Sequence, residues 1–200
     1  QAVLDLGADI INDVWALQWR GDSEADPSRA ESVPAPQSAV PPGMAIVAAH
    51  PNCGVCVMHM HRDPWSMQVK PMEGDALPQV LQFWADIVKQ LSDLGIGKSR
   101  IVLDPGVGFG KTVAQNFSLL ARQSELLAAG YPLLVGWSRK SSLAAATSTS
   151  LATIATLDIR DRLVPSVAAA LLAVERGASI VRVHDVRETV QALKVLNAIK

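Results

Sequence analysis

The stretch Ile101-Val-Leu-Asp-Pro-Gly-Val-Gly-Phe-Gly-Lys111 decides the fold, because an apolar run delivers a carboxylate, Asp104, into a glycine-rich loop. Parallel strands collect such polar residues at their C-terminal ends, and so build one site in a barrel or an open sheet. The chain is therefore predicted to be an α/β protein with a polar site at one edge of its strands. Four more apolar runs end in polar residues in the same way: Ile10-Ile11, Val55-Cys-Val57, Leu133-Leu-Val135 and Ile180-Val181.

Strands and helices are predicted to alternate along the chain. Apolar residues recur every three or four positions over 76–94, which is typical of one helical face. The alternation favours a parallel sheet with right-handed crossovers, and the uniformly apolar strands are expected to be buried on both faces. We expect strands at 9–12, 55–59, 101–104, 133–136 and 179–183, and helices at 1–6, 43–50, 76–94, 116–129, 158–176 and 186–199.

Two segments interrupt this alternation. Residues 20–43 hold five of the twelve prolines and no aromatic residue, so we expect a disordered insertion that buries too little apolar area to fold. Residues 141–157 are rich in small side chains, which fits either a mobile loop beside the site or a poorly specified start of a helix. Apart from the insertion, residues 1–200 are interpreted as a single domain.

Composition narrows the class of protein. Hydrophobic residues make up 49% of the chain, enough for a substantial core, and a net charge of -1 gives no sign of a nucleic-acid or membrane surface. The apolar runs are too short to span a bilayer. With only two cysteines, the protein is expected to be cytoplasmic and not to depend on disulfides.

Two groups of residues near strand ends indicate a ligand. A phosphate-binding loop needs glycine where Pro105 stands, and the dinucleotide fingerprint also fails over 106–112. The carboxylate of Asp104 is instead suited to accept two N–H donors from a flat heterocycle. Ser138-Arg139-Lys140 follows a predicted strand and Gly136, and two cations beside a glycine favour an anionic or carbonyl-bearing ligand.

The last predicted strand ends in a further cationic pair. Alternation places Arg182 and His184 on one side of the strand, where a guanidinium and an imidazole make an anion clamp suited to phosphate. A buried histidine with satisfied hydrogen bonds is the alternative for His184. Asn12 also stands at a strand end and offers an amide to a heterocycle, although asparagine equally caps turns. Asp13 is explained as well by a structural role.

Two other motifs are weaker. Cys53-Gly-Val-Cys56 has redox spacing, but it leads into a strand instead of opening a helix, which disfavours a redox role. Met58-His59-Met60-His61 offers two imidazoles without an evident third ligand, so no metal ligand is assigned within this chain. Met58 is expected to pack against a ligand or the core.

These residues, in this order, resemble the dihydropteroate synthase family, and the resemblance covers the whole chain apart from 20–43. It implies a (β/α)8 TIM barrel of which this chain holds strands four to eight, a partial barrel that lacks the first three strands. The matching blocks are Gly7-Ala-Asp-Ile-Ile-Asn-Asp-Val14, Val55-Cys-Val-Met-His-Met60, Leu103-Asp-Pro-Gly-Val-Gly-Phe-Gly-Lys111, Gln115-Asn-Phe-Ser-Leu-Leu120, Leu133-Leu-Val-Gly-Trp-Ser-Arg-Lys140 and Arg182-Val-His-Asp185.

The resemblance implies a transferase of folate biosynthesis. Such an enzyme joins 6-hydroxymethyl-7,8-dihydropterin pyrophosphate to p-aminobenzoate and gives 7,8-dihydropteroate and pyrophosphate. It also implies Mg2+ as cofactor, with the protein ligand in the missing N-terminal part, and a homodimer formed through the last helices, here 186–199.

The resemblance further implies a role for each of nine residues. Lys140, Arg182 and His184 are the expected catalytic residues. Asn12, Asp104 and Lys140 would hold the pterin, Met58 would line its pocket and Gly136 would lie close to the ring. Arg182 would stack on the pterin and would bind pyrophosphate together with His184. Ser138 and Phe109 would border the p-aminobenzoate site.

Two alternatives stay open. A methyltetrahydrofolate:corrinoid methyltransferase-type barrel shares the strand-end Asn and Asp, but its substrate has no pyrophosphate for Arg182 and His184 to clamp. An inactive truncated paralogue is the second alternative, supported by the missing strands. Since five strands cannot close an eight-stranded barrel, we expect unpaired edges at the first and last strands, and a chain that is inactive or unstable alone.

Overall fold

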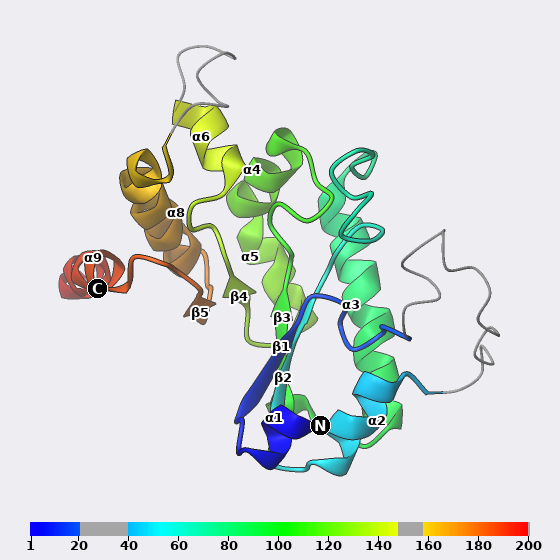
Figure 1. The fold of residues 1–200 in the computed structure, drawn as a ribbon. Coiled ribbons are helices and arrows are strands. Elements are labelled where there is room, and N and C mark those ends of the chain that lie inside the picture. Colours follow the sequence, from blue (N-terminus) through cyan, green and yellow to red (C-terminus); the bar gives the residue numbers. More distant parts are fainter. Residues whose placement is uncertain (21–39, 148–157, 200) are drawn as a thin grey trace.

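The structure of the protein is a computed structural model, and it describes residues 1–20, 40–147 and 158–199. Its strands are parallel and follow one another in chain order, with loops and helices between them (Figure 1). The five predicted strands are all present, each within a few residues of its predicted bounds. They are β1 (Ile10–Asp13), β2 (Gly54–Met58), β3 (Ile101–Asp104), β4 (Leu134–Val135) and β5 (Ile180–Val181).

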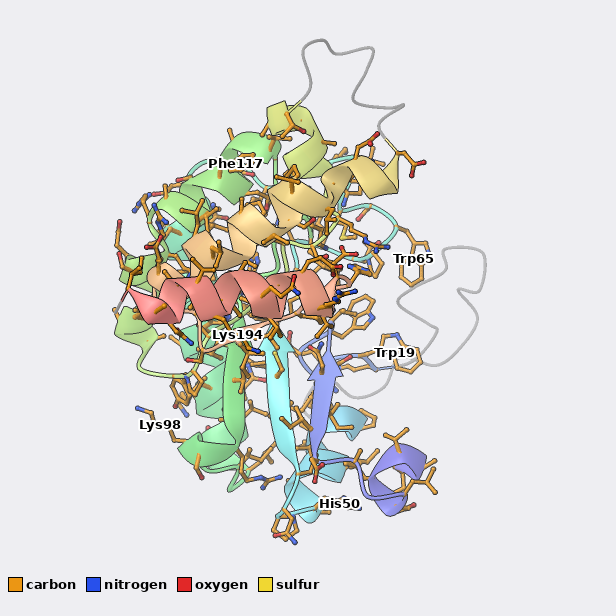
Figure 2. The ribbon with its side chains drawn as sticks, turned by 90° about the vertical axis from the view of Figure 1, so that its left-hand side faces the viewer. Trp19, His50, Trp65, Lys98, Phe117 and Lys194 are labelled. Atoms are coloured by element: carbon orange, nitrogen blue, oxygen red, sulfur yellow. The ribbon has the colours of Figure 1, made fainter. Side chains whose placement is uncertain are left out.

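The strands form two sheets that a single bridge links. One sheet has the order β1-β2-β3 and the other pairs β4 with β5, while a parallel bridge between Leu103 and Leu133 joins β3 to the start of β4. All five strands therefore run side by side in one direction, and their C-terminal ends lie at the same edge. Figure 2 shows this polarity, with His50 at one end of the strands and Trp19 and Trp65 at the other.

Helices connect the strands, as predicted for parallel pairing. The helix α3 begins where the Asp75 carboxylate accepts a hydrogen bond from the backbone N–H of Leu77, and it ends before Gly95, which has a φ of +79°. The helices are α1 (Ala2–Asp5), α2 (Pro42–Ala49), α3 (Ala76–Asp93), α4 (Val113–Ala121), α5 (Gln123–Leu126), α6 (Ser141–Thr147), α8 (Leu163–Glu175) and α9 (Val186–Ala198), with 3-10 turns at Lys98–Arg100, Leu127–Ala129 and Ile159–Arg162.

One helical prediction needs correction, and two other predicted segments lie partly outside the described residues. The helix predicted over 116–129 is divided into α4, α5 and a 3-10 turn, and α4 begins earlier because Thr112 and Gln115 form a reciprocal capping box. Of the two interpretations of 141–157, the start of a helix is confirmed over α6, while 148–157 lies outside the described residues. The insertion predicted at 20–43 lies mostly outside them too, and Pro42 already belongs to α2.

The two faces of the strands have different roles. In β2 and β3 the side chains of Val55, Val57, Ile101 and Leu103 pack on one face against buried residues of the helices, Trp84 of α3 among them. Side chains on the other face alternate with these. This second face carries the polar residues predicted for the site.

The prediction that every strand is buried on both faces is wrong for the first and last strands. Ile10 of β1 is 54% exposed and Ile180 of β5 is 38% exposed, because within the described residues β1 pairs only with β2 and β5 only with β4. The unpaired edges expected at both ends are thus present in that part of the chain. No helix among the described residues is long and apolar enough to cross a membrane.

Candidate functional site

The strand register brings three predicted site residues to one face. Met58 is the partner of Asp104 across the β2–β3 pair, and Asn12 is the partner of Cys56, two residues before Met58. Met58 and Asp104 are buried, whereas Asn12 is exposed on β1. The three side chains therefore share the face that the helices leave uncovered, with the carboxylate near its centre.

The loop after β3 holds the carboxylate of Asp104 in place. The backbone N–H of Gly106 donates to Asp104 Oδ1 at 2.7 Å, and the backbone N–H of Gly108 donates to Asn116 Oδ1 at 2.9 Å. Gly106, Gly108 and Gly110 all have positive φ values, between 66° and 79°. This left-handed conformation favours glycine and explains why three of these residues alternate along the loop.

Gly106 is required for a second reason, which is space. A Cβ atom at this position would lie 1.9 Å from the backbone oxygen of His59, at the end of β2. The loop after β3 therefore packs directly on the loop after β2. This close approach brings Asp104 and the end of β2 together.

Arg182 lies against Asp104 across the strands. Its Nη2 atom is 3.7 Å from Asp104 Oδ2, and a Cβ at Gly136 would lie 3.0 Å from the same nitrogen. The absence of a side chain at Gly136 thus makes room for the guanidinium, while the predicted approach of Gly136 to a ligand stays a prediction. Burial raises the pKa of Asp104, while the N–H of Gly106 and the nearby cations, Arg182 first among them, act in the opposite direction.

The ends of β4 and β5 are joined by hydrogen bonds. Ser138 Oγ accepts a hydrogen bond from the backbone N–H of His184 at 3.1 Å and lies 2.9 Å from His184 Nδ1. The prediction that Arg139 and Lys140 both face a ligand does not hold for Arg139. Its guanidinium instead makes a two-point ion pair with Asp185, with distances of 2.7 and 3.2 Å, which lowers the pKa of that carboxyl.

Lys140, in the segment after β4, is the cation that faces the glycine loop after β3. Its Nζ lies 4.3 Å from the centre of the Phe109 ring, a cation–π distance, and its stem packs beside Gly108. Burial and the Arg182 guanidinium both lower the pKa of Lys140. Two predicted site residues, Phe109 and Lys140, are thus in direct contact.

Sequence reasoning missed one residue at the centre of the site. Lys111 is buried, and its ammonium lies 2.8 Å from His59 Nδ1 and 3.0 Å from the backbone oxygen of Gly106. The only signal in the sequence is its position directly after the glycine loop, where a lysine is usually solvated. His59, one of the two imidazoles noted in the sequence, has this lysine as its buried partner.

The two cysteines do not form a redox site. Cys53 and Cys56 are both free and buried, and burial raises the pKa of Cys56 to about 12, with the Asp104 charge adding to the effect. A thiol with this pKa stays protonated and unreactive near neutral pH. Among the described residues, no three His, Cys, Asp or Glu side chains come close enough to hold a metal ion.

The fold and the site thus define an α/β enzyme-like scaffold with one buried carboxylate and several cations at the C-terminal ends of parallel strands. Comparison with known proteins gives the class. The family of pterin binding enzymes matches residues 1–184, and the chain belongs to this family.

Named relatives are dihydropteroate synthases. The chain is 36% identical over 193 residues to the dihydropteroate synthase of Escherichia coli strain K12, which covers 96% of this chain and 58% of the relative. It is 39% identical over 194 residues to that of Neisseria meningitidis serogroup C, with 96% and 59% covered. The chain therefore spans about three fifths of the length of these relatives.

Solved structures agree with this assignment. A dihydropteroate synthase from Stenotrophomonas maltophilia with imidazole in its active site superposes with a TM-score of 0.80 and 36% identity, covering 99% of this chain and 64% of that one. The Xanthomonas albilineans enzyme in complex with 7,8-dihydropteroate gives a TM-score of 0.78 and 34% identity, covering 99% and 63%. The expected fold class, an α/β fold of TIM-barrel type, is thus confirmed at this level.

Proposed function

We propose that this chain is the pterin-binding part of a dihydropteroate synthase, which condenses 6-hydroxymethyl-7,8-dihydropterin pyrophosphate with p-aminobenzoate and releases pyrophosphate. The observation that carries the proposal is the buried Asp104 carboxylate, held by the Gly106 N–H and facing Arg182. A carboxylate in this setting accepts paired N–H donors from a flat heterocycle. We further propose that the part of the relatives not covered here is the first three strands of the barrel.

The binding roles follow from the chemistry of each group. Asp104 accepts the ring N–H donors of the pterin, and the Lys140 ammonium donates to its carbonyl side. Asn12 and Met58, on the same face, complete the pterin subsite, with Gly136 leaving room beside the ring. Ser138 and Phe109 border the p-aminobenzoate subsite in this proposal.

The charges suit the departure of pyrophosphate. Negative charge builds on the leaving group as the bond to the pterin methylene breaks, and Arg182 and His184 are placed to stabilise it. The amine of p-aminobenzoate is already neutral at pH 7, so it needs positioning more than a strong base. Fixed cations around one carboxylate favour this reaction over methyl transfer, whose substrate carries no pyrophosphate.

Mg2+ stays part of the proposal without a site in this chain. The described residues bring no group of three His, Cys, Asp or Glu side chains together, and the proposed pyrophosphate subsite holds the Arg182 guanidinium, which does not bind a metal ion. These residues do not fit a metal ion by themselves. The resemblance assigns the metal ligand to the first strands, and that assignment stays a prediction.

A homodimer and a cytoplasmic location also remain proposals. Four exposed apolar side chains on and just after the last helix are the support for an interface there, because exposed apolar surface can mark a contact with a partner. Light scattering on the purified chain tests this. The four side chains are Val186, Val190 and Val195 of α9 with Ile199 just beyond it, which are 43% to 78% exposed. The first two lie on one side of the helix and the last two on the opposite side.

Calorimetric titration tests the function. Pterin pyrophosphate with Mg2+ is titrated into this chain and into a fusion that adds the first three βα units of the E. coli relative, and both are assayed for dihydropteroate. Binding and turnover by the fusion, lost in Asp104→Asn but kept in the exposed control Asp93→Asn, support the proposal. A folded fusion that neither binds nor turns over shows that the proposal is wrong.

A further inference from the structure

Lys111 has an unusual environment for a lysine. It is 5% exposed, and its Nζ lies 2.8 Å from His59 Nδ1, 3.0 Å from the backbone oxygen of Gly106, and 3.3 Å from the backbone oxygens of His59 and Phe109. An ammonium has three N–H donors and no acceptor, so these four groups use its full capacity. The side chain is therefore enclosed, and it has no free donor to offer a substrate.

The four partners belong to two segments that flank the proposed pterin subsite. Two come from His59 at the end of β2, and two come from the glycine loop after β3. The imidazole is itself fixed, because the His59 ring meets Phe83 of α3 edge to face with 5.2 Å between ring centres. Lys111 thus ties the glycine loop to a buried residue directly after β2.

Two of the three carbonyls that accept from Lys111 belong to residues that contact the proposed site. Gly106 accepts from Lys111 through its oxygen and donates through its N–H to Asp104 Oδ1 at 2.7 Å. Phe109 accepts through its oxygen, and its ring lies 4.3 Å from Lys140 Nζ. One buried ammonium is therefore linked to Asp104 through Gly106 and to Lys140 through Phe109.

The electrostatics fit a residue that acts within the protein. The imidazole is a neutral acceptor, since burial and the Lys111 charge lower the pKa of His59 to about 3. Burial also lowers the pKa of Lys111 to about 7, against the opposing effect of Asp104. Without carbonyl partners, an ammonium at this depth would be too costly to keep.

We propose that Lys111 is a positioning residue for the pterin subsite, which fixes Asp104 through Gly106 and Lys140 through Phe109 without contacting the substrate. The expected effect on pterin binding rests on the proposed function, whereas the positioning of Asp104 and Lys140 by Lys111 does not. Removing the ammonium should release both carbonyls, so that the carboxylate and the Lys140 ammonium lose their relative placement.

Nuclear magnetic resonance of the free chain tests the geometry. Lys111→Met keeps the length of the side chain and removes the donors, and Lys89→Met replaces a lysine that is 75% exposed on α3, as a matched control. We expect the Asp104 carboxyl 13C shift and the Lys140 ε-methylene shift, which the Phe109 ring influences, both to move in Lys111→Met alone. If Lys111→Met does not fold, Lys111→Gln, a shorter side chain with two N–H donors, carries the same comparison.

Unchanged Asp104 and Lys140 shifts in a folded Lys111 variant overturn the proposal, whatever the ligand data show. Calorimetry with pterin pyrophosphate on the fusion described above gives the functional consequence. We expect the Kd to rise by roughly 10- to 100-fold in the Lys111 variant and to be unchanged in Lys89→Met. If the shifts move but the parent fusion binds no pterin, the positioning role stands and the proposed function fails. Equal Kd values for the parent and the Lys111 variant overturn the positioning of the pterin subsite.

Discussion

Gly106→Ala is the substitution whose effect follows most directly from the structure. The residue has a φ of +66°, and a Cβ added to it would lie 1.9 Å from the His59 backbone oxygen. To reach an ordinary contact of 3.4 Å, the two loops must separate by about 1.5 Å. That movement strains the hydrogen bond from Gly106 to Asp104 and the contacts of Lys111.

The expected cost has two parts. The left-handed conformation costs an alanine roughly 1–2 kcal/mol. Forcing an extra methyl group into packed surroundings costs a further 1–3 kcal/mol, approximately. The free energy of unfolding should therefore fall by about 2–5 kcal/mol, and with a denaturant slope of about 2 kcal/mol per molar the urea midpoint should fall by about 1–2.5 M.

Urea unfolding followed by tryptophan fluorescence measures this change, with two glycines as matched controls. Gly95 has a φ of +79° and open space around its Cβ position, so Gly95→Ala reports the conformational cost alone. Gly97 has open space and no positive φ, so Gly97→Ala should change little. If Gly106→Ala and Gly95→Ala lower the midpoint equally, the close packing of the two loops is refuted.

Three further predictions concern charge. The unfolded chain keeps the Lys111 proton up to the ordinary pKa of 10.5, whereas the folded chain releases it near 7, so the free energy of unfolding should rise with pH between these values. The urea midpoint of Lys111→Met should lack that rise. If the midpoints of the parent and of Lys111→Met change in parallel with pH, the burial of the ammonium is contradicted. A double-mutant cycle on Arg139 and Asp185 should give a coupling free energy of about 1 kcal/mol or less. This coupling should still be larger than that of the exposed pair Lys89–Asp93. Equal couplings would argue against a structural role for the Arg139–Asp185 pair. Cys56, with a pKa of about 12, should be alkylated by iodoacetamide at pH 8 only as fast as the chain unfolds, and faster labelling detected by mass spectrometry would show that the thiol is accessible.

Local patterns in the sequence are enough to predict the strands and the main helices. Short apolar runs between glycine- and proline-rich turns, and the apolar face repeated over 76–94, depend on neighbours in the chain and not on tertiary contacts. The strand-end residues Asp104, Lys140 and Arg182 could be predicted for the same reason. Parallel strands bring their C-terminal ends to one edge whatever the details of packing.

Tertiary packing decided how these residues are used. Arg139 and Lys140 are adjacent cations in the sequence. Only the structure shows that Arg139 pairs with Asp185, whereas Lys140 contacts Phe109 of the glycine loop. Lys111 would be taken for a solvated residue until the end of β2 is placed against that loop and encloses its ammonium. The amino-acid sequence determines which charged groups are available, whereas the partner of each charge depends on contacts between segments distant in the chain.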